Sequence, residues 1–191
     1  IELSPPPQPF ASIDQMSKTF SLGGTLKRIF LIFRKHLALL YFERKQGLFH
    51  PGRLKKLPFT LLCEIHNWRT FKFFQKHVEH DQKKIFGEAY FFYAMSQEPE
   101  FSVQGRCKEF SDQEAIIKAI ATSLPVGTKL VYKEHGTIGA RSIEFYRRLN
   151  QLPNVIMASP SIRGIDLAKH SVGVLTFGGT VALEGLNFGK S

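Results

Sequence analysis

The chain has 191 residues, a length that fits one domain or one domain with an extension. Hydrophobic residues make up 43% of the sequence and the mean hydropathy is −0.13, values typical of a globular protein. The most apolar stretch, residues 29–42, is interrupted by Arg34, Lys35 and His36 and falls short of the roughly 18 apolar residues that a membrane span needs. We therefore expect a globular protein without a transmembrane helix.

The formal net charge is +10 at pH 7, and most of the basic excess lies between residues 18 and 84. Such an excess favours anionic partners, which include nucleic acid, anionic lipid and nucleotide phosphates, and it selects none of them by itself. Cys63 and Cys107 form no metal-ligand pattern, so we expect two reduced thiols. The chain begins with neither Met nor the pattern of a secretion signal, which favours a cytoplasmic protein and a piece of a longer chain.

Residues 1–84 form the first of two predicted segments, a basic and mostly helical extension. Residues 1–15 hold four of the ten prolines, so we expect an extended or mobile start. Residues 25–45 predict a helix, because apolar residues recur at spacings of three and four on one face. That stripe consists of Leu26, Phe30, Phe33, Leu37 and Leu40. Residues 59–80 predict a second helix after a break that contains proline and glycine.

Residues 85–191 alternate short apolar runs with helical patterns, which predicts an α/β domain. Four runs predict strands, at residues 89–95, 128–133, 154–159 and 171–177. Helices are predicted between and after them, at residues 111–125, 140–153, 165–169 and 180–190. The strands are continuously apolar, as in parallel sheets that are covered on both faces. With right-handed crossovers, the expected fold is a Rossmann-like parallel sheet with helices on both faces.

Residue types predict further details of the first two helices in this domain. Ser111, with Glu114 three residues later, has the pattern of a capping box, which marks a helix start. The buried stripe of that helix is predicted to contain Ile116, Ile117 and Ile120. In the next helix, Phe145 and Leu149 are expected on one face.

Polar residues follow the predicted strands at the edge where a doubly wound sheet binds ligands. Glu98 and Glu100 follow the first strand, while Lys133 and His135 lie at the end of the second. We expect His135 to project into the ligand site, where it can donate a hydrogen bond to a phosphate or carry a positive charge beside one. The alternative is that His135 only caps loop backbone.

The fourth predicted strand is followed by Gly178, Gly179 and Thr180, at the start of a helix. Glycines permit a close backbone approach, and the free N–H groups of a helix start bind phosphate. Glu184 shares a helix face with Thr180, where it can accept hydrogen bonds from the sugar hydroxyls of a nucleotide. Glycines also serve tight turns, and the pattern is neither GxGxxG nor Walker A, so no NAD or ATP assignment follows.

Several pieces of the second segment occur in an order that resembles a known family. They are YFFYAMSQEPEFS, DQEAIIKAIATSLPVGTKLVYKEHGTIGARSIEFYRRLNQLPNV, the strand that follows, and GTVALEGLNFGK. Together they make residues 85–191 similar to the bacterial capsular polysaccharide biosynthesis family, sugar transferases related to those that add Kdo. The family usually reads Gln-Pro-Glu and His-Pro where this chain has Glu98-Pro99-Glu100 and His135-Gly136.

The resemblance implies a glycosyltransferase of capsular or surface polysaccharide synthesis that has two Rossmann-like domains. This chain would hold the C-terminal one, cut short at its end. The donor would be a nucleotide-activated sugar, best matched by a CMP-linked acidic sugar, and the acceptor a lipid-linked or growing glycan; neither a cofactor nor a metal is expected. His135 would be the catalytic residue that stabilises the leaving phosphate. The other implied site residues hold the nucleotide-sugar: Glu98, Glu100, Lys133, Gly178, Gly179, Thr180 and Glu184.

The basic first segment has two interpretations. Because the resemblance implies lipid-linked acceptors and other capsule-assembly proteins as partners, a basic amphipathic helix is expected to rest on the anionic inner face of the cell membrane. The alternative is an ordinary helix that packs on the domain. Two other functions stay open for the whole chain. One is a non-catalytic scaffold that keeps the nucleotide fold, and the other is a basic nucleic-acid-binding module, for which we find no zinc finger, RRM signature or clear helix-turn-helix.

Overall fold

The computed structural model describes residues 21–46, 56–96, 110–134, 141–177 and 181–190. The chain separates into two compact units, residues 1–72 and residues 73–191. The division falls within the helix Lys56–His77, whereas the sequence predicts a boundary after residue 84.

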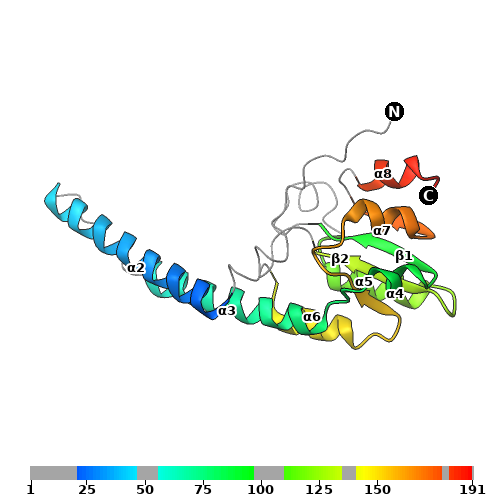
Figure 1. The fold of residues 1–191 in the computed structure, drawn as a ribbon, viewed down its shortest axis with the longest axis horizontal. Coiled ribbons are helices and arrows are strands. Elements are labelled where there is room, and N and C mark those ends of the chain that lie inside the picture. Colours follow the sequence, from blue (N-terminus) through cyan, green and yellow to red (C-terminus); the bar gives the residue numbers. More distant parts are fainter. Residues whose placement is uncertain (1–20, 47–55, 97–109, 135–140, 178–180, 191) are drawn as a thin grey trace. The chain divides into compact units, whose positions relative to one another are not determined.

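The first unit contains α2 (Leu22–Lys45) and most of α3 (Lys56–His77), which confirms both predicted helices. The two helices lie side by side (Figure 1), where Arg28 Nε on α2 donates to Glu64 Oε2 on α3 at 2.7 Å. The N-cap of α2 is Ser21, whose hydroxyl accepts a hydrogen bond from the amide of Gly24 at 3.0 Å. The predicted apolar stripe forms on α2, but all of its members except the half-buried Leu40 are exposed.

The second unit is built on a four-stranded sheet in which every pairing is parallel. The strands are β1 (Tyr90–Ala94), β2 (Lys129–Lys133), β3 (Val155–Met157) and β4 (Gly173–Leu175), in the spatial order β3-β2-β1-β4. The helices around it are α4 (Gln82–Phe86), α5 (Gln113–Ser123), α6 (Ile143–Asn150), α7 (Gly164–His170) and α8 (Val181–Asn187). The α/β fold with a parallel sheet and flanking helices is thus confirmed (Figure 1).

One face of the sheet packs against α4, α7 and α8. Its buried core joins Tyr90 and Phe92 of β1 to Val131 of β2 and to Leu167 of α7. The Tyr90 hydroxyl donates to the Leu167 carbonyl at 2.8 Å, so this deeply buried polar group is satisfied.

A glycine lets α8 approach β4 closely on this face. A Cβ atom at Gly185 would lie 2.9 Å from Val174 Cγ2, a distance that side-chain carbons do not tolerate. The position therefore needs a residue without a side chain.

The opposite face of the sheet packs against α5 and α6. Tyr93 of β1 and Gln113 of α5 are both buried, and the Tyr93 hydroxyl donates to Gln113 Oε1 at 2.6 Å. Tyr146 of α6 is fully buried and meets Phe74, in the last turn of α3, edge to face with ring centroids 4.6 Å apart. Helices on both faces of a parallel sheet define a doubly wound, Rossmann-like arrangement.

The start of α5 differs from the prediction. Its N-cap is Asp112, whose carboxylate accepts a hydrogen bond from the Ala115 amide at 3.0 Å, so the prediction of Ser111 as the cap was wrong. Both residue types favour the N-cap, and the choice between neighbours depends on where the backbone turns. In the predicted stripe of this helix Ile117 is buried and its two isoleucine neighbours are half-buried.

The buried face of α6 also differs in one residue. Leu149 is buried as expected, but its aromatic companion is Tyr146, whereas Phe145 is half-buried. Tyr146 is tolerated in the core because its hydroxyl donates a hydrogen bond to the carboxylate of Glu134. The hydrophobic pattern alone does not show this contact.

Candidate functional site

The strand order identifies the edge of the sheet where a ligand is expected. Along the chain the sheet grows from β1 through β2 to β3, and β4 is then added on the other side of β1. This reversal is a topological switch point, and doubly wound sheets bind ligands there, outside the carboxyl ends of the strands. The carboxyl ends of β1 and β4 therefore define the candidate site, with the end of β2 beside it.

Lys133 is the predicted site residue that the structure describes most fully. It ends β2 and pairs in register with Ala94, the last residue of β1, so it lies at the carboxyl edge next to the switch point. Burial lowers the pKa of its amine to about 8, although Asp166 at the start of α7 acts in the opposite direction. A half-buried amine of this kind loses its positive charge near pH 8, and such a perturbed group at a strand end is a candidate for a functional site.

Glu184 is the second predicted site residue within the described part. It lies half-buried in the first turn of α8, the helix that packs on β4. Because β1 separates β2 from β4, the strand ends that carry Lys133 and lead to Glu184 are about 10 Å apart.

The other predicted site residues fall outside the described residues, so their placement stays a prediction: Glu98, Glu100, His135, Gly178, Gly179 and Thr180. The structure does describe the strands that precede these residues in the sequence. Residues 97–109, 135–140 and 178–180 each begin within three residues of the carboxyl end of β1, β2 and β4.

A buried polar network occupies the end of β2. Glu134 follows the strand directly and forms an ion pair with Arg141, and both side chains are almost fully buried. The Tyr146 hydroxyl donates to the second carboxylate oxygen of Glu134 at 2.7 Å, which helps explain why the pKa of Tyr146 is raised beyond the effect of its burial. A buried ion pair needs further hydrogen bonds to offset the cost of removing its charges from water, and the Tyr146 hydroxyl supplies one of them to Glu134.

The same network links the ends of two strands. Arg141 Nη2 donates to the carbonyl oxygen of Ser96, just after β1, at 2.8 Å. Glu134 and Arg141 are also the described residues on either side of 135–140, so their ion pair holds the two ends of that stretch together. The network thus fixes Glu134, the last described residue before 135–140, at the end of β2.

Aromatic side chains lie at the switch point itself. Phe177, two residues after β4, stacks on Phe110 with ring centroids 4.5 Å apart and meets Tyr93 of β1 edge to face at 6.2 Å. Gln113 fixes this group, since its amide donates to the Phe110 carbonyl at 3.1 Å while its oxygen accepts from Tyr93. Phe110 is 44% exposed, so it offers an aromatic surface on which a base can stack.

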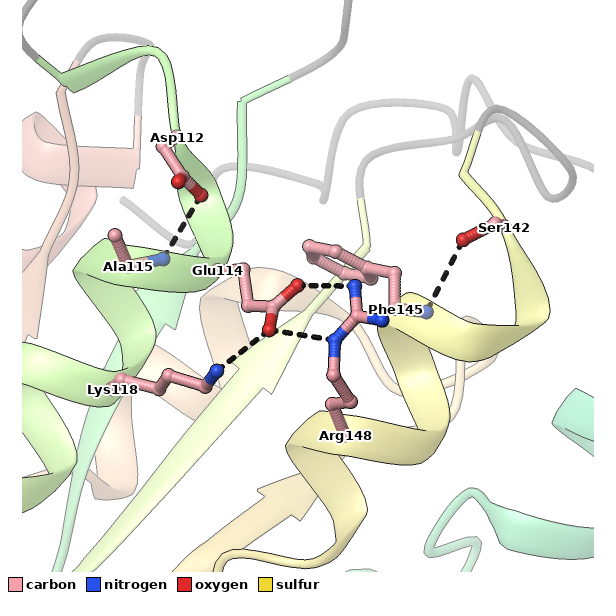
Figure 2. Close-up of polar contacts among 7 residues, drawn as sticks. All are labelled: Asp112, Glu114, Ala115, Lys118, Ser142, Phe145 and Arg148. Atoms are coloured by element: carbon pink, nitrogen blue, oxygen red, sulfur yellow. Dashed lines mark hydrogen bonds and ion pairs between the residues drawn. The ribbon is translucent and has the colours of Figure 1, made fainter.

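Glu114 joins the two helices of one face of the sheet (Figure 2). Its carboxylate accepts two hydrogen bonds from Arg148 of α6, at 2.7 and 2.8 Å, and one from Lys118 of its own helix at 2.7 Å. These partners, Arg148 first, lower the pKa of Glu114 to about 2. The contact therefore holds α5 against α6.

Five residues near this edge were not predicted as site residues: Phe110, Glu134, Arg141, Tyr146 and Phe177. Glu134 could have been singled out from the sequence, because a carboxylate directly after a buried strand needs a partner. The aromatic residues could not have been singled out, because their pairing depends on the strand order. Among the residues that the structure describes, no three His, Cys, Asp or Glu side chains gather as a metal site.

Comparisons with known proteins identify no relative. No model of a protein family matches the chain, and no curated protein or solved structure is significantly similar to it. The fold and the residues at the carboxyl edge of the sheet therefore carry the functional argument.

Proposed function

We propose that residues 85–191 are the donor-binding domain of a glycosyltransferase that uses a nucleotide-activated sugar, CMP-linked, in capsular or surface polysaccharide biosynthesis. In this proposal the chain is the C-terminal half of an enzyme with two Rossmann-like domains, preceded by a basic helical segment. The observation that carries the proposal is the switch point between β1 and β4. Along the chain, the predicted site residues lie at or after the carboxyl ends of β1, β2 and β4, the strands at and beside that point.

The proposed chemistry is the displacement of a nucleotide from a sugar. An acceptor hydroxyl loses its proton to a carboxylate base that the other domain would supply and forms the new glycosidic bond. The bond between the anomeric carbon and the phosphate oxygen breaks, and CMP leaves with the electron pair. Negative charge grows on the phosphate, and a preorganised donor there contributes about 3 kcal/mol to transition-state stabilisation. His135 and the helix start at Gly179 and Thr180 would supply such donors, and Lys133 would add positive charge.

The other residues would hold the nucleoside. Glu100 and Glu184 would accept hydrogen bonds from base or ribose groups, as would Glu98, which lies two residues before Glu100. Phe110 offers the exposed aromatic ring at the switch point, and base stacking on such a ring contributes about 1–3 kcal/mol. These roles need no metal ion.

The proposal is tested by nucleotide binding to the full chain. Thermal-shift measurements with CMP, UDP, GDP and a nucleotide-free control should show a CMP-selective rise in the unfolding temperature. The absence of any nucleotide response would instead favour the non-catalytic scaffold. Tight RNA binding with a steep salt dependence, and no nucleotide selectivity, would favour the nucleic-acid-binding module.

The strand β2 offers a matched pair of variants for this test. Lys133→Met removes a charge at the carboxyl edge and should weaken CMP binding by roughly tenfold to a hundredfold, the value of a charge-assisted hydrogen bond. Lys129→Met removes a charge from the same face of the same strand at its other end, and should leave the affinity unchanged. Equal effects of the two substitutions would contradict the placement of the site.

A further inference from the structure

We infer that α2 binds the surface of an anionic lipid bilayer, with an apolar stripe along the helix entering the bilayer interface. The stripe consists of large apolar residues at spacings of three and four, all exposed: Leu22, Leu26, Phe30, Phe33, Leu37 and Tyr41. Phe30 is 64% exposed and Tyr41 73%, which is unusual for aromatic residues in a helix of a folded unit. Exposed apolar patches of this kind mark interaction surfaces.

The opposite side of α2 has a different environment. Thr25 is buried and Arg28 is half-buried, and Arg28 reaches Glu64 of α3. The helix therefore turns one side toward α3 and leaves the stripe on another, so α3 does not cover it. In the described part of the chain no helix is both long enough and apolar enough to cross a bilayer, so the inferred contact lies in the plane of the membrane interface.

Charge identifies the kind of surface that the stripe fits. Nine Lys or Arg residues and two Glu residues lie in residues 21–46 and 56–72, an excess of seven positive charges. Lys27, Arg34 and Lys45 border the stripe on one side, as the 100° rotation per residue requires. Basic residues beside an apolar stripe are the pattern of helices that lie on anionic membranes, because their long side chains reach up to the headgroups.

A second copy of the chain fits the stripe less well. A helical pair of two identical stripes needs opposite charges beside the seam, and residues 22–42 contain no Asp or Glu. In such a pair, Lys27 and Arg34 would face basic or neutral residues of the second copy. Nucleic acid would use the positive charge but leave the six apolar side chains in water.

Vesicle co-sedimentation of the full chain tests the inference. Binding is expected to vesicles of phosphatidylcholine with about 30% phosphatidylglycerol, to fall with added NaCl, and to be weak on phosphatidylcholine alone. Failure to bind anionic vesicles, or equal binding to both compositions, would overturn the inference. The nucleotide site is not used here, so this result and the CMP result are independent.

Paired variants on α2 locate the contact. Phe30→Ser with Phe33→Ser should weaken binding by about tenfold to a hundredfold, because two aromatic rings leave the bilayer interface. Leu31→Ser with Phe42→Ser removes two exposed apolar residues from the other side of the same helix and should change it by less than about threefold. Equal losses in the two double variants would overturn the inference, and circular dichroism checks that both keep their helix content.

Charge variants complete the test. Lys27→Gln and Arg34→Gln should each weaken binding about fivefold, whereas Lys169→Gln, an exposed position on α7, should have no effect. Two other results would refute the inference: RNA binding that survives Phe30→Ser with Phe33→Ser while no vesicle binding is found, and self-association that this double variant abolishes, also without any vesicle binding.

Discussion

The buried ion pair between Glu134 and Arg141 allows a quantitative prediction. Arg141→Met removes the guanidinium that forms the ion pair with the buried Glu134 carboxylate. Loss of one member of a buried pair costs about 3–5 kcal/mol, a large part of the roughly 5–15 kcal/mol that stabilises a domain. Arg147→Met is the control, because Arg147 forms an exposed ion pair with Glu144 on the same helix, and it should cost less than about 1 kcal/mol.

The measurement is urea-induced unfolding followed by the near-ultraviolet circular dichroism of tyrosine. Four of the five tyrosines lie in residues 73–191, so the signal reports mainly on the second unit. The double variant Glu134→Gln with Arg141→Met should be less destabilised than the sum of the single variants, because no unpaired charge stays buried. The reasoning would be refuted if Arg141→Met cost no more than Arg147→Met, or if the two effects were additive.

Three further predictions follow from the second unit. Burial holds the pKa of Lys133 at about 8, so its charge is lost above that pH; CMP affinity measured by calorimetry should fall about tenfold from pH 7 to pH 9, and a flat profile would contradict this role. The ion pairs of Glu114 lower its pKa to about 2, so their stabilisation is complete above pH 4.5 and is lost as the pH falls toward 2. In urea titrations Glu114→Gln should cost roughly 1 kcal/mol at pH 7 and nothing near pH 2, and an equal cost at both would contradict it. Gly185→Ala should cost about 1–3 kcal/mol because of Val174, whereas Gly23→Ala, with no atom within 4 Å of its added Cβ, should not destabilise the protein; thermal unfolding distinguishes the two.

Local sequence patterns predicted the elements of the fold except the short helix α4, which has a single turn and too few residues to show a periodic pattern. The four apolar runs became four parallel strands in a sheet that helices cover on both faces, and the burial of the central strands β1 and β2 leaves a strong and local signal in the sequence. The spacing of apolar residues on α2 likewise predicted a helix. It did not reveal that the stripe is exposed, because periodicity reports which residues share a face and not what covers that face.

Features that depend on tertiary contacts could not be predicted. The place of β4 beside β1 creates the switch point, and no single segment encodes that neighbour. The pairing of Phe110 with Phe177 follows from the same strand order. Glu134 and Arg141 are seven residues apart, and their pairing requires the chain to return to the end of β2 before α6 begins.

Amide chemical-shift changes on addition of CMP to the isotope-labelled full chain test the central claim most directly. If the nucleotide binds at the switch point, the largest changes among the described residues should lie at 94–96, 133–134, 176–177 and 181–184. Residues at the other end of the strands, including 89–90, 128–129 and 172–173, should change little. Changes concentrated at those residues or along α2, or no change at all at high CMP concentration, would contradict the claim.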